Sequence, residues 1–155
     1  MRVNTKIRYG LRTMIELGLN ENSKSDTGLY QKEIAEHQNL SEKYLDPIIA
    51  ALKISGLIKN AGGKKSGYLL AKPQSEIRIY DIYRAFEPEL SIIHCMNKPV
   101  TCFVSHICVA NEYWMDLNDV ITGHMKKTTL EEMVKKHVKI KKRIAKEVLT
   151  GHCQS

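Results

Sequence analysis

The sequence predicts a mainly α-helical fold with one small β-hairpin. In residues 4–19, 30–38 and 41–55, apolar side chains recur at spacings of three and four, which is typical of helices that bury one face. Two β-prone runs, GLIKN and YLLAK, flank the glycine-rich segment AGGKKSG, and this arrangement predicts a hairpin. A further apolar stripe with helical spacing over residues 105–126 predicts a long helix after the hairpin.

Local signals set the expected ends of these elements. Asn4 and Ser41 can cap the first and third helices, because their side chains accept hydrogen bonds from free backbone N–H groups. A short helix is expected at 79–87 and ends before Pro88. The pair Thr128 and Glu131 forms a capping-box pattern that predicts a new helix after the long one.

Composition and charge narrow the class of protein. The 155 residues suffice for one core without disulfides, and 24 Lys and Arg against 17 Asp and Glu give a net charge of +7. This excess fits a nucleic-acid partner. No apolar run reaches membrane-spanning length, and Arg2, Lys6, Arg8 and Arg12 interrupt any apolar stretch of the kind a signal peptide needs. We therefore expect no signal peptide and a cytoplasmic protein that does not bind membranes. Because the sequence has no phosphate loop, HExxH motif or supported nucleophile–base pair, we do not expect an enzyme.

Residues 31–52 match a helix-turn-helix. Ala35 supplies the small residue where two helices cross, and Asn39 tolerates a left-handed backbone in the turn. The apolar residues that would pin the second helix to the first are Ile34, Leu40, Leu45 and Ile48. An ordinary helical hairpin is the alternative.

The hairpin that follows favours a winged helix-turn-helix, in which the second helix enters the DNA major groove and the wing approaches the backbone or minor groove. The start of the second helix and the hairpin tip are therefore the expected contacts with DNA. These residues are Ser41, Glu42, Lys43, Tyr44, Lys64 and Lys65. A solubilising turn is the alternative for the two wing lysines.

Three of the four cysteines, Cys95, Cys102 and Cys108, lie within fourteen residues, separated by six and five others. Soft thiolates suit iron–sulfur clusters and zinc. A zinc site completed by His94 or His106 lacks the usual paired spacing. The three cysteines could also form a thiol sensor without a cluster, or be buried and inert. The remaining cysteine, Cys153, matches no motif.

The segments TKIRYGLRTMIELG, EIAEHQNLSEKYLDPIIAALKISGLIKN, GYLLAKP and TLEEMV together resemble winged-helix regulators of the IscR and NsrR type, an iron–sulfur cluster-binding family. The resemblance extends to about residue 137. It implies a homodimeric DNA-binding transcription factor that recognises an inverted repeat and pairs through the 105–126 helix. On that helix the implied interface residues are Ala110, Tyr113, Trp114, Leu117, Val120 and Ile121.

The resemblance also implies that the three clustered cysteines hold a 2Fe–2S or 4Fe–4S cluster. The fourth ligand stays open, because Arg8 and Asn111 stand where relatives carry an acidic ligand and a histidine ligand. His94, His106, Asn111 or a group of the partner chain could serve. Two further departures are Pro47 inside the second helix of the motif and Gly62, which stands in place of a wing arginine.

The predicted organisation has four parts: a winged helix-turn-helix at 1–88, a cluster-binding loop at 89–108, dimerisation helices at 109–137 and a basic tail at 138–155. The predicted function is a transcriptional regulator, such as a repressor, whose DNA binding responds through the cluster to redox state, iron–sulfur status or nitric oxide. The alternative is a winged-helix regulator without a cluster that answers to a small molecule, thiol oxidation or zinc.

Overall fold

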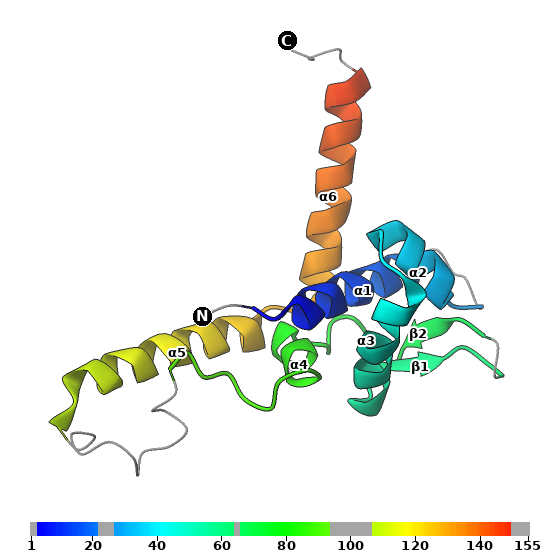
Figure 1. Cartoon of the computed structure of the whole chain (residues 1–155). Helices are drawn as coiled ribbons and strands as arrows, with labels where there is room; N and C mark the ends of the chain where they lie inside the picture. Colours follow the sequence, from blue (N-terminus) through cyan, green and yellow to red (C-terminus); the bar gives the residue numbers. More distant parts are fainter. Residues whose placement is uncertain (1–2, 22–26, 64–65, 94–106, 150–155) are drawn as a thin grey trace.

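The computed structural model describes residues 3–21, 27–63, 66–93 and 107–149. Six helices and two short strands lie in this part of the chain (Figure 1). In order they are α1 (Thr5–Glu21), α2 (Gln31–Gln38), α3 (Glu42–Ile54), β1 (Ile58–Asn60), β2 (Tyr68–Leu70), α4 (Ile79–Arg84), α5 (Val109–Lys127) and α6 (Leu130–Leu149). The predicted mainly α fold with one β-hairpin is confirmed.

One buried apolar cluster joins α1, α2, α3, the hairpin, α4 and the first turns of α6. Its members from the three N-terminal helices include Met14, Leu17, Ile34, Leu45 and Ile48. The remaining buried contacts come from later segments, with Leu70, Ile77, Ile82, Leu130 and Val134 among them. Each fully buried aliphatic side chain contributes about 1.5–3 kcal/mol, so this shared core fixes α1 to α4 and the start of α6 as one body.

The hairpin pairs β1 and β2 antiparallel, with Ile58 opposite Leu70 and Asn60 opposite Tyr68. Leu29, just before α2, forms an isolated bridge to Tyr68 on the other side of β2. Only one side of the hairpin reaches the core, since Ile58 and Leu70 are buried while Lys59 and Asn60 are exposed. The hairpin therefore projects from the body as a wing (Figure 1).

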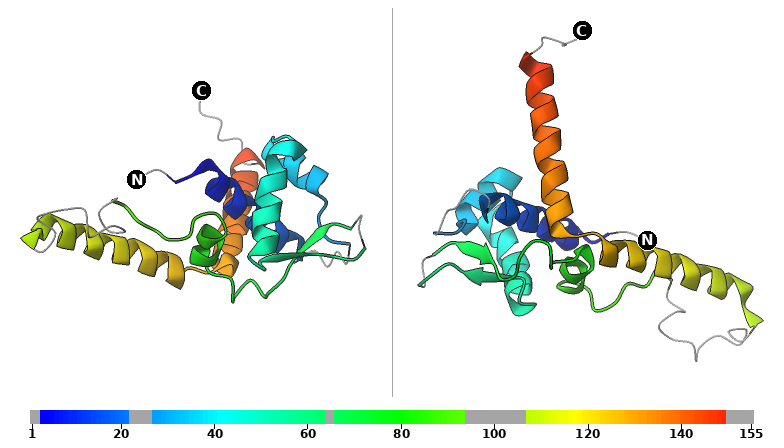
Figure 2. Two further views of the ribbon diagram at one scale, coloured as in Figure 1. Left: turned by 60° about the horizontal axis from the view of Figure 1, so that its bottom comes forward. Right: turned by 180° about the vertical axis from the view of Figure 1, so that it is seen from behind.

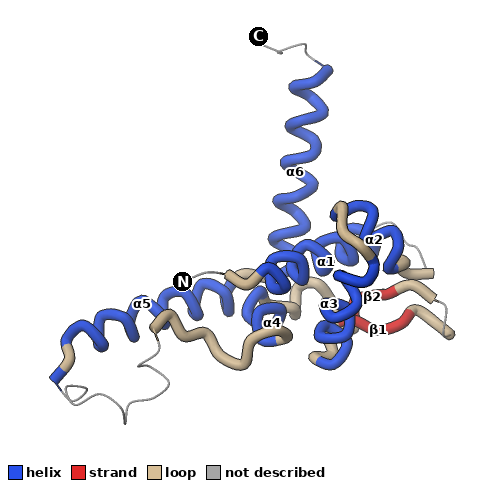
Figure 3. Tube along the Cα trace, viewed as in Figure 1, coloured by secondary structure: helices blue, strands red, loops and turns tan. Residues whose placement is uncertain are grey.

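The last two helices leave the body in different directions. Figures 1 and 2 show α5 extending on the side opposite the hairpin and α6 standing off the body beside α1. The tube in Figure 3 shows that helices make up both projections. Only the C-terminal part of α5 packs on the body, where Ile121 and Met125 contact a second small cluster of Ile7, Tyr83 and Leu90.

Three predicted boundaries are wrong in detail. The long helix begins at Val109, with Cys108 at its N-cap, rather than at Ser105. The capping box is formed by Thr129 and Glu132, one residue later than predicted: the Glu132 N–H donates to Thr129 Oγ1 at 3.2 Å and the Thr129 N–H donates to Glu132 Oε2 at 3.3 Å. The shift arises because the Thr128 hydroxyl instead donates to the His124 carbonyl and closes α5.

The third boundary concerns α4, which ends at Arg84, with Ala85 as its C-cap, rather than at Glu87. The basic segment after residue 137 continues as part of α6 to Leu149, and its residues 139–148 are exposed. None of the described helices is both long and apolar enough to cross a bilayer.

Candidate nucleic-acid interface and cysteine site

The turn between α2 and α3 has the conformation that a helix-turn-helix requires. Asn39 is left-handed, with φ 53° and ψ 50°, and is the one non-glycine residue with positive φ in the described part of the chain. The Leu40 N–H donates to the Ala35 carbonyl at 2.9 Å, which closes the turn. Ala35 is only 2% exposed, so a larger side chain there would push α3 away from α2.

The first turn of α3 is open to solvent. The Ser41 hydroxyl accepts a hydrogen bond from the Tyr44 N–H at 3.2 Å and so caps the helix. Ser41, Glu42, Lys43 and Tyr44 are all exposed. The residues predicted to contact DNA therefore lie on an accessible surface. A helix N-terminus with free N–H groups also favours an anion such as phosphate. Pro47 does not interrupt α3, which runs on to Ile54.

A basic aromatic cluster beside this turn was not predicted from the sequence. The Tyr9 ring on α1 meets the Tyr44 ring edge-on, with centroids 5.8 Å apart. The guanidinium groups of Arg8 and Arg12 lie 5.7 and 5.3 Å from the Tyr9 centroid. Both arginines are accessible to solvent, and stacking on a ring leaves the N–H groups of a guanidinium able to bind phosphate. The four-residue spacing of the arginines places them on one helix face, but the sequence does not show that this face adjoins α3.

The turn of the wing is held by hydrogen bonds around its tip. The Ser66 hydroxyl donates to the Gly63 carbonyl and accepts from the Gly62 N–H, both at 2.8 Å. Lys64 and Lys65, the predicted wing contacts, lie outside the described residues. Lys59 on β1 is exposed and adds a positive charge to the same hairpin.

Of the three clustered cysteines, only Cys108 falls in the described residues. It is half-buried, occupies the N-cap of α5, and its side chain caps no backbone N–H. Asn111 and the acidic side chains Glu112, Asp116 and Asp119 line a hollow of about 410 Å³ together with this thiol. Within residues 3–21, 27–63, 66–93 and 107–149 no group of three potential ligands for a metal ion comes together. Cys95, Cys102, His94 and His106 lie outside those ranges.

The predicted interface stripe on α5 is largely exposed. Tyr113 is 62% and Val120 67% exposed, and Ala110 and Trp114 are also exposed. The remaining two members of the stripe, Leu117 and Ile121, are half-buried. A row of apolar side chains of this size on one helix is typical of a protein–protein contact.

The junction between α5 and α6 is hydrogen-bonded to the segment that leaves the wing. The Ile79 N–H donates to the Thr128 carbonyl at 3.0 Å, and the Leu130 N–H donates to the Ile77 carbonyl at 2.9 Å. The Glu131 N–H donates to the Gln74 carbonyl at 3.3 Å. A displacement of α5 would therefore act on the segment that joins it to the wing.

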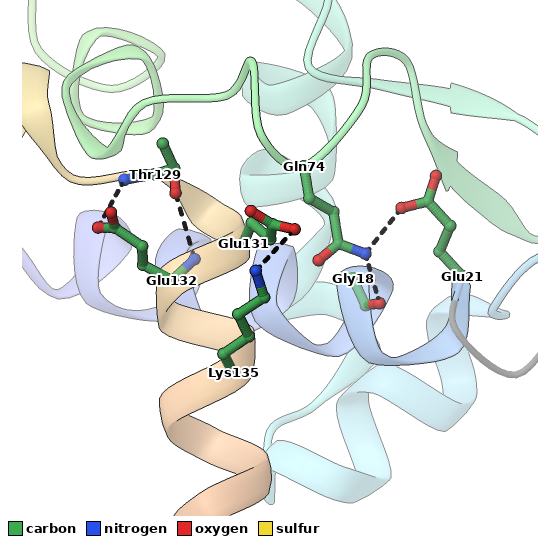
Figure 4. A network of polar contacts seen from close by, with 7 residues as sticks. All are labelled: Gly18, Glu21, Gln74, Thr129, Glu131, Glu132 and Lys135. Atoms are coloured by element: carbon green, nitrogen blue, oxygen red, sulfur yellow. Dashed lines mark hydrogen bonds and ion pairs between the residues drawn. The ribbon is translucent and has the colours of Figure 1, made fainter.

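Gln74 extends this junction to α1 (Figure 4). Its side-chain amide donates to the Gly18 carbonyl at 2.9 Å and to Glu21 Oε2 at 2.8 Å. On α6 the Lys135 ammonium pairs with Glu131 Oε1 at 2.9 Å. The close-up shows these contacts side by side with the Thr129–Glu132 capping box. The end of α1, the segment that leaves the wing and the start of α6 therefore meet in one place.

These elements define a winged helix-turn-helix transcriptional regulator, a class that comparison with known proteins supports. The sequence profile of Rrf2, described as an iron-dependent transcriptional regulator, matches residues 3–136, and the chain belongs to this family. The HTH-type transcriptional regulator IscR of Escherichia coli O1:K1 is 31% identical over 135 residues, which are 86% of this chain and 80% of the relative.

Two solved structures are similar along most of their length. CymR, the global cysteine regulator of B. subtilis, superimposes with a TM-score of 0.71 at 30% identity and covers 87% of this chain and 97% of its own. IscR of T. potens has a TM-score of 0.69 at 30% identity and covers 88% of each chain. The predicted resemblance to IscR-type regulators and the winged-helix fold are thereby confirmed.

Proposed function

We propose that this protein is a homodimeric transcriptional regulator of the cytoplasm that binds an inverted repeat in double-stranded DNA. The first turn of α3 enters the major groove, and the wing with Lys64 and Lys65 contacts the backbone. An iron–sulfur cluster held by Cys95, Cys102 and Cys108 modulates this binding.

The observation that carries the DNA-binding part is the open first turn of α3 beside the basic cluster on α1. Ser41 and Lys43 offer donors to phosphate or base edges, and Arg8 and Arg12 widen the positive surface around them. A two-fold dimer places two such helices about one DNA turn, ~34–36 Å, apart. An inverted repeat with that spacing is the expected operator.

The apolar stripe of α5 supports the proposed dimer. Tyr113 and Val120 are largely uncovered by the described part of the chain, and a second α5 offers a matching stripe across a two-fold axis. Such pairing is isologous, since the same face serves in both protomers.

The position of Cys108 supports the proposed cluster. Its thiol is half-buried at the N-cap of α5 and caps no backbone N–H, and cysteine sulfur is the usual ligand of iron–sulfur clusters. A bound cluster would supply a redox-active, oxidisable centre at this end of α5. Asn111 lines the same hollow as Cys108 and is one candidate for the fourth ligand.

The path from the cysteine site to DNA runs along α5. Cys108 begins this helix, and its other end is hydrogen-bonded through Thr128 to the segment that follows the wing. A change in the position of α5 therefore changes the placement of the wing. In a dimer it also changes the spacing of the two α3 helices, which are the recognition helices. This is how the cysteine site would alter DNA affinity or site preference.

A second candidate is a regulator that works without a cluster and answers to a small molecule, thiol oxidation or zinc. Its support is the similarity to CymR, which is described as a cysteine regulator. The two candidates differ in what the purified protein contains.

The test is anaerobic purification followed by an absorption spectrum and iron, sulfide and zinc analysis. Replacing Cys95, Cys102 or Cys108 by alanine should abolish or destabilise the cluster, because a lost thiolate has no equivalent oxygen donor. The matched control, Cys153→Ala, should keep it. Fluorescence anisotropy on one operator should then differ between the holo protein and Cys102→Ala. Stoichiometric zinc without iron after anaerobic reconstitution would exclude the cluster and favour the second candidate.

A further inference from the structure

A hollow of about 600 Å³ lies between α1, the segment that leads into α2, and α6. Figures 1 and 2 show α6 rising beside α1 at this place. Its apolar lining comes from Ile15, Leu19 and Leu29. The volume is in the range of sites for small molecules, which combine an apolar wall with a few polar groups.

Three polar side chains that line the hollow have an atom that is buried without a hydrogen bond to another described residue. These atoms are the Asn20 amide nitrogen Nδ2 and the Glu16 carboxyl oxygen Oε2 on α1, and the His137 ring nitrogen Nε2 on α6. Buried polar atoms are rarely left without a partner, because their desolvation is then uncompensated. The amide of Asn20 can only donate at Nδ2, so this atom requires an acceptor.

The charged groups around the hollow favour an anion. Arg12 and Lys141 contribute two cationic groups, one from α1 and one from α6. The one carboxyl group in the lining is Glu16, whose Oε2 lies 3.7 Å from His37 Nδ1. Burial raises the pKa of Glu16 above 4.5, while the charges of His37 and Arg12 and a hydrogen bond with Gln38 lower it. The positive groups beside this carboxylate therefore offset part of its repulsion of a bound anion.

Part of the lining comes from a segment beyond the region shared with the family. The Rrf2 match ends at residue 136, whereas His137 and Lys141 lie on the continuation of α6. The hollow thus depends on the part of α6 that extends past the family profile.

We propose that this hollow binds a small organic carboxylate with about six carbons in all, most of them in an apolar chain. The carboxylate accepts from Asn20 and His137 between the cationic groups of Arg12 and Lys141, and the hydrocarbon covers Ile15, Leu19 and Leu29. A ligand bound there holds α6 against α1 and the start of α2, which makes it an effector of the helix-turn-helix. The proposal does not depend on the cluster.

The test is a titration of the isotope-labelled whole chain with hexanoate. NMR measures the chemical-shift changes of the backbone amides and of the histidine rings. We expect saturable shifts at residues of the hollow with a Kd of about 1 mM or below, as eight heavy atoms allow. Hexanol and hexylammonium, which keep the chain length and lack the carboxylate, should bind at least about tenfold more weakly. Equal binding of hexanol, or no saturable shift with hexanoate, would overturn the proposal.

Two variants with the same charge change separate a site from general attraction. Lys141→Glu should weaken hexanoate binding by about tenfold or more, because a cation beside the carboxylate becomes a repelling anion. Lys142→Glu is the matched control: this neighbouring residue is exposed and does not line the hollow, so it should leave Kd almost unchanged. An equal loss in both variants would show non-specific attraction and overturn the proposal.

The source of the carboxylate is resolved by L-norleucine, which is hexanoate with an α-ammonium group. Tighter binding of L-norleucine would identify an amino acid whose ammonium faces Glu16. Tighter binding of hexanoate would identify a simple carboxylic acid. Failure of both probes, with a cluster still present in the protein, would refute the effector site and leave the proposed cluster function standing.

Discussion

Ser41 has two separable roles in the proposed function, as the cap of the recognition helix and as a contact with phosphate. Its Oγ accepts from the Tyr44 N–H at 3.2 Å, and removal of such a cap costs about 1 kcal/mol, within a range of about 0.5–2. For a chain of about 150 residues this lowers Tm by about 2–4 °C. We therefore expect Ser41→Ala to reduce Tm by this amount, measured by circular dichroism.

Ser41→Asp is the informative counterpart. The carboxylate still accepts from the Tyr44 N–H, and a negative charge at a helix N-terminus is favourable, so Tm should stay the same or rise. On DNA the same charge faces phosphate. One repulsion at about 4 Å costs about 1–4 kcal/mol at effective dielectric constants between those of water and a protein surface. This corresponds to a loss of about fivefold to several hundredfold in affinity.

The assay is fluorescence anisotropy on a duplex selected from a random pool by the wild-type protein, at one fixed salt concentration. The two variants should affect stability and DNA affinity differently. Ser41→Ala should lower Tm with only a small effect on DNA affinity, whereas Ser41→Asp should keep Tm and weaken DNA binding. Wild-type affinity in the Asp variant would refute the placement of the α3 N-terminus against the phosphate backbone. An unchanged Tm in the Ala variant would refute the stabilising cap.

Three other changes test the dimer, the wing and the half-buried carboxyl group of Glu16. Leu117→Glu places a charge in the apolar stripe of α5 and should yield monomers by light scattering, whereas a stable dimer would locate the interface elsewhere. Replacing Lys64 and Lys65 by alanine should weaken binding to all duplexes and flatten the salt slope by at most ~2 units, and an unchanged slope would mean that the wing does not touch phosphate. Glu16→Gln should alter the pH dependence of stability. Because burial raises the Glu16 pKa above 4.5, the folded state holds more protons than the unfolded state just above pH 4.5, and the free energy of unfolding falls as pH rises through that window. Urea titrations at several pH values should show that the free energy of unfolding falls in this window for the wild type but not for Glu16→Gln. Parallel pH profiles for the wild type and the variant would contradict this role of Glu16.

Local features of the fold were predictable because their causes lie within a few residues. Asn39 is left-handed because its side chain tolerates that conformation better than most, and Ser41 caps α3 because its hydroxyl reaches an N–H three residues on. The hairpin likewise follows from glycine-rich chemistry between two β-prone runs. The predicted position of the capping box was wrong by one residue, because Thr128 and Thr129 are equivalent in sequence. The end of α5 decides between them, since the Thr128 hydroxyl bonds there and leaves Thr129 to cap α6.

The candidate DNA surface was predicted in part. The predicted exposure of residues 41–44 at the start of α3 is confirmed, while their contact with DNA stays a prediction. The arginine cluster on α1 was not predicted, because it lies about thirty positions earlier in the chain and meets α3 only through packing of the shared core. The cysteine ligands of the cluster and the dimer interface on the apolar stripe of α5 stay predictions.

By itself the sequence determined the type and order of the elements and the devices at their ends, since periodicity, capping and turn chemistry act over a few residues. Tertiary structure alone decided which distant segments meet. Gln74 reaches the end of α1 and the α5–α6 junction, and His137 and Asn20 come to share one hollow. The physical reason is that these contacts follow from how helices bury their apolar faces against one common core, and a local pattern shows that a face is apolar without showing what will cover it.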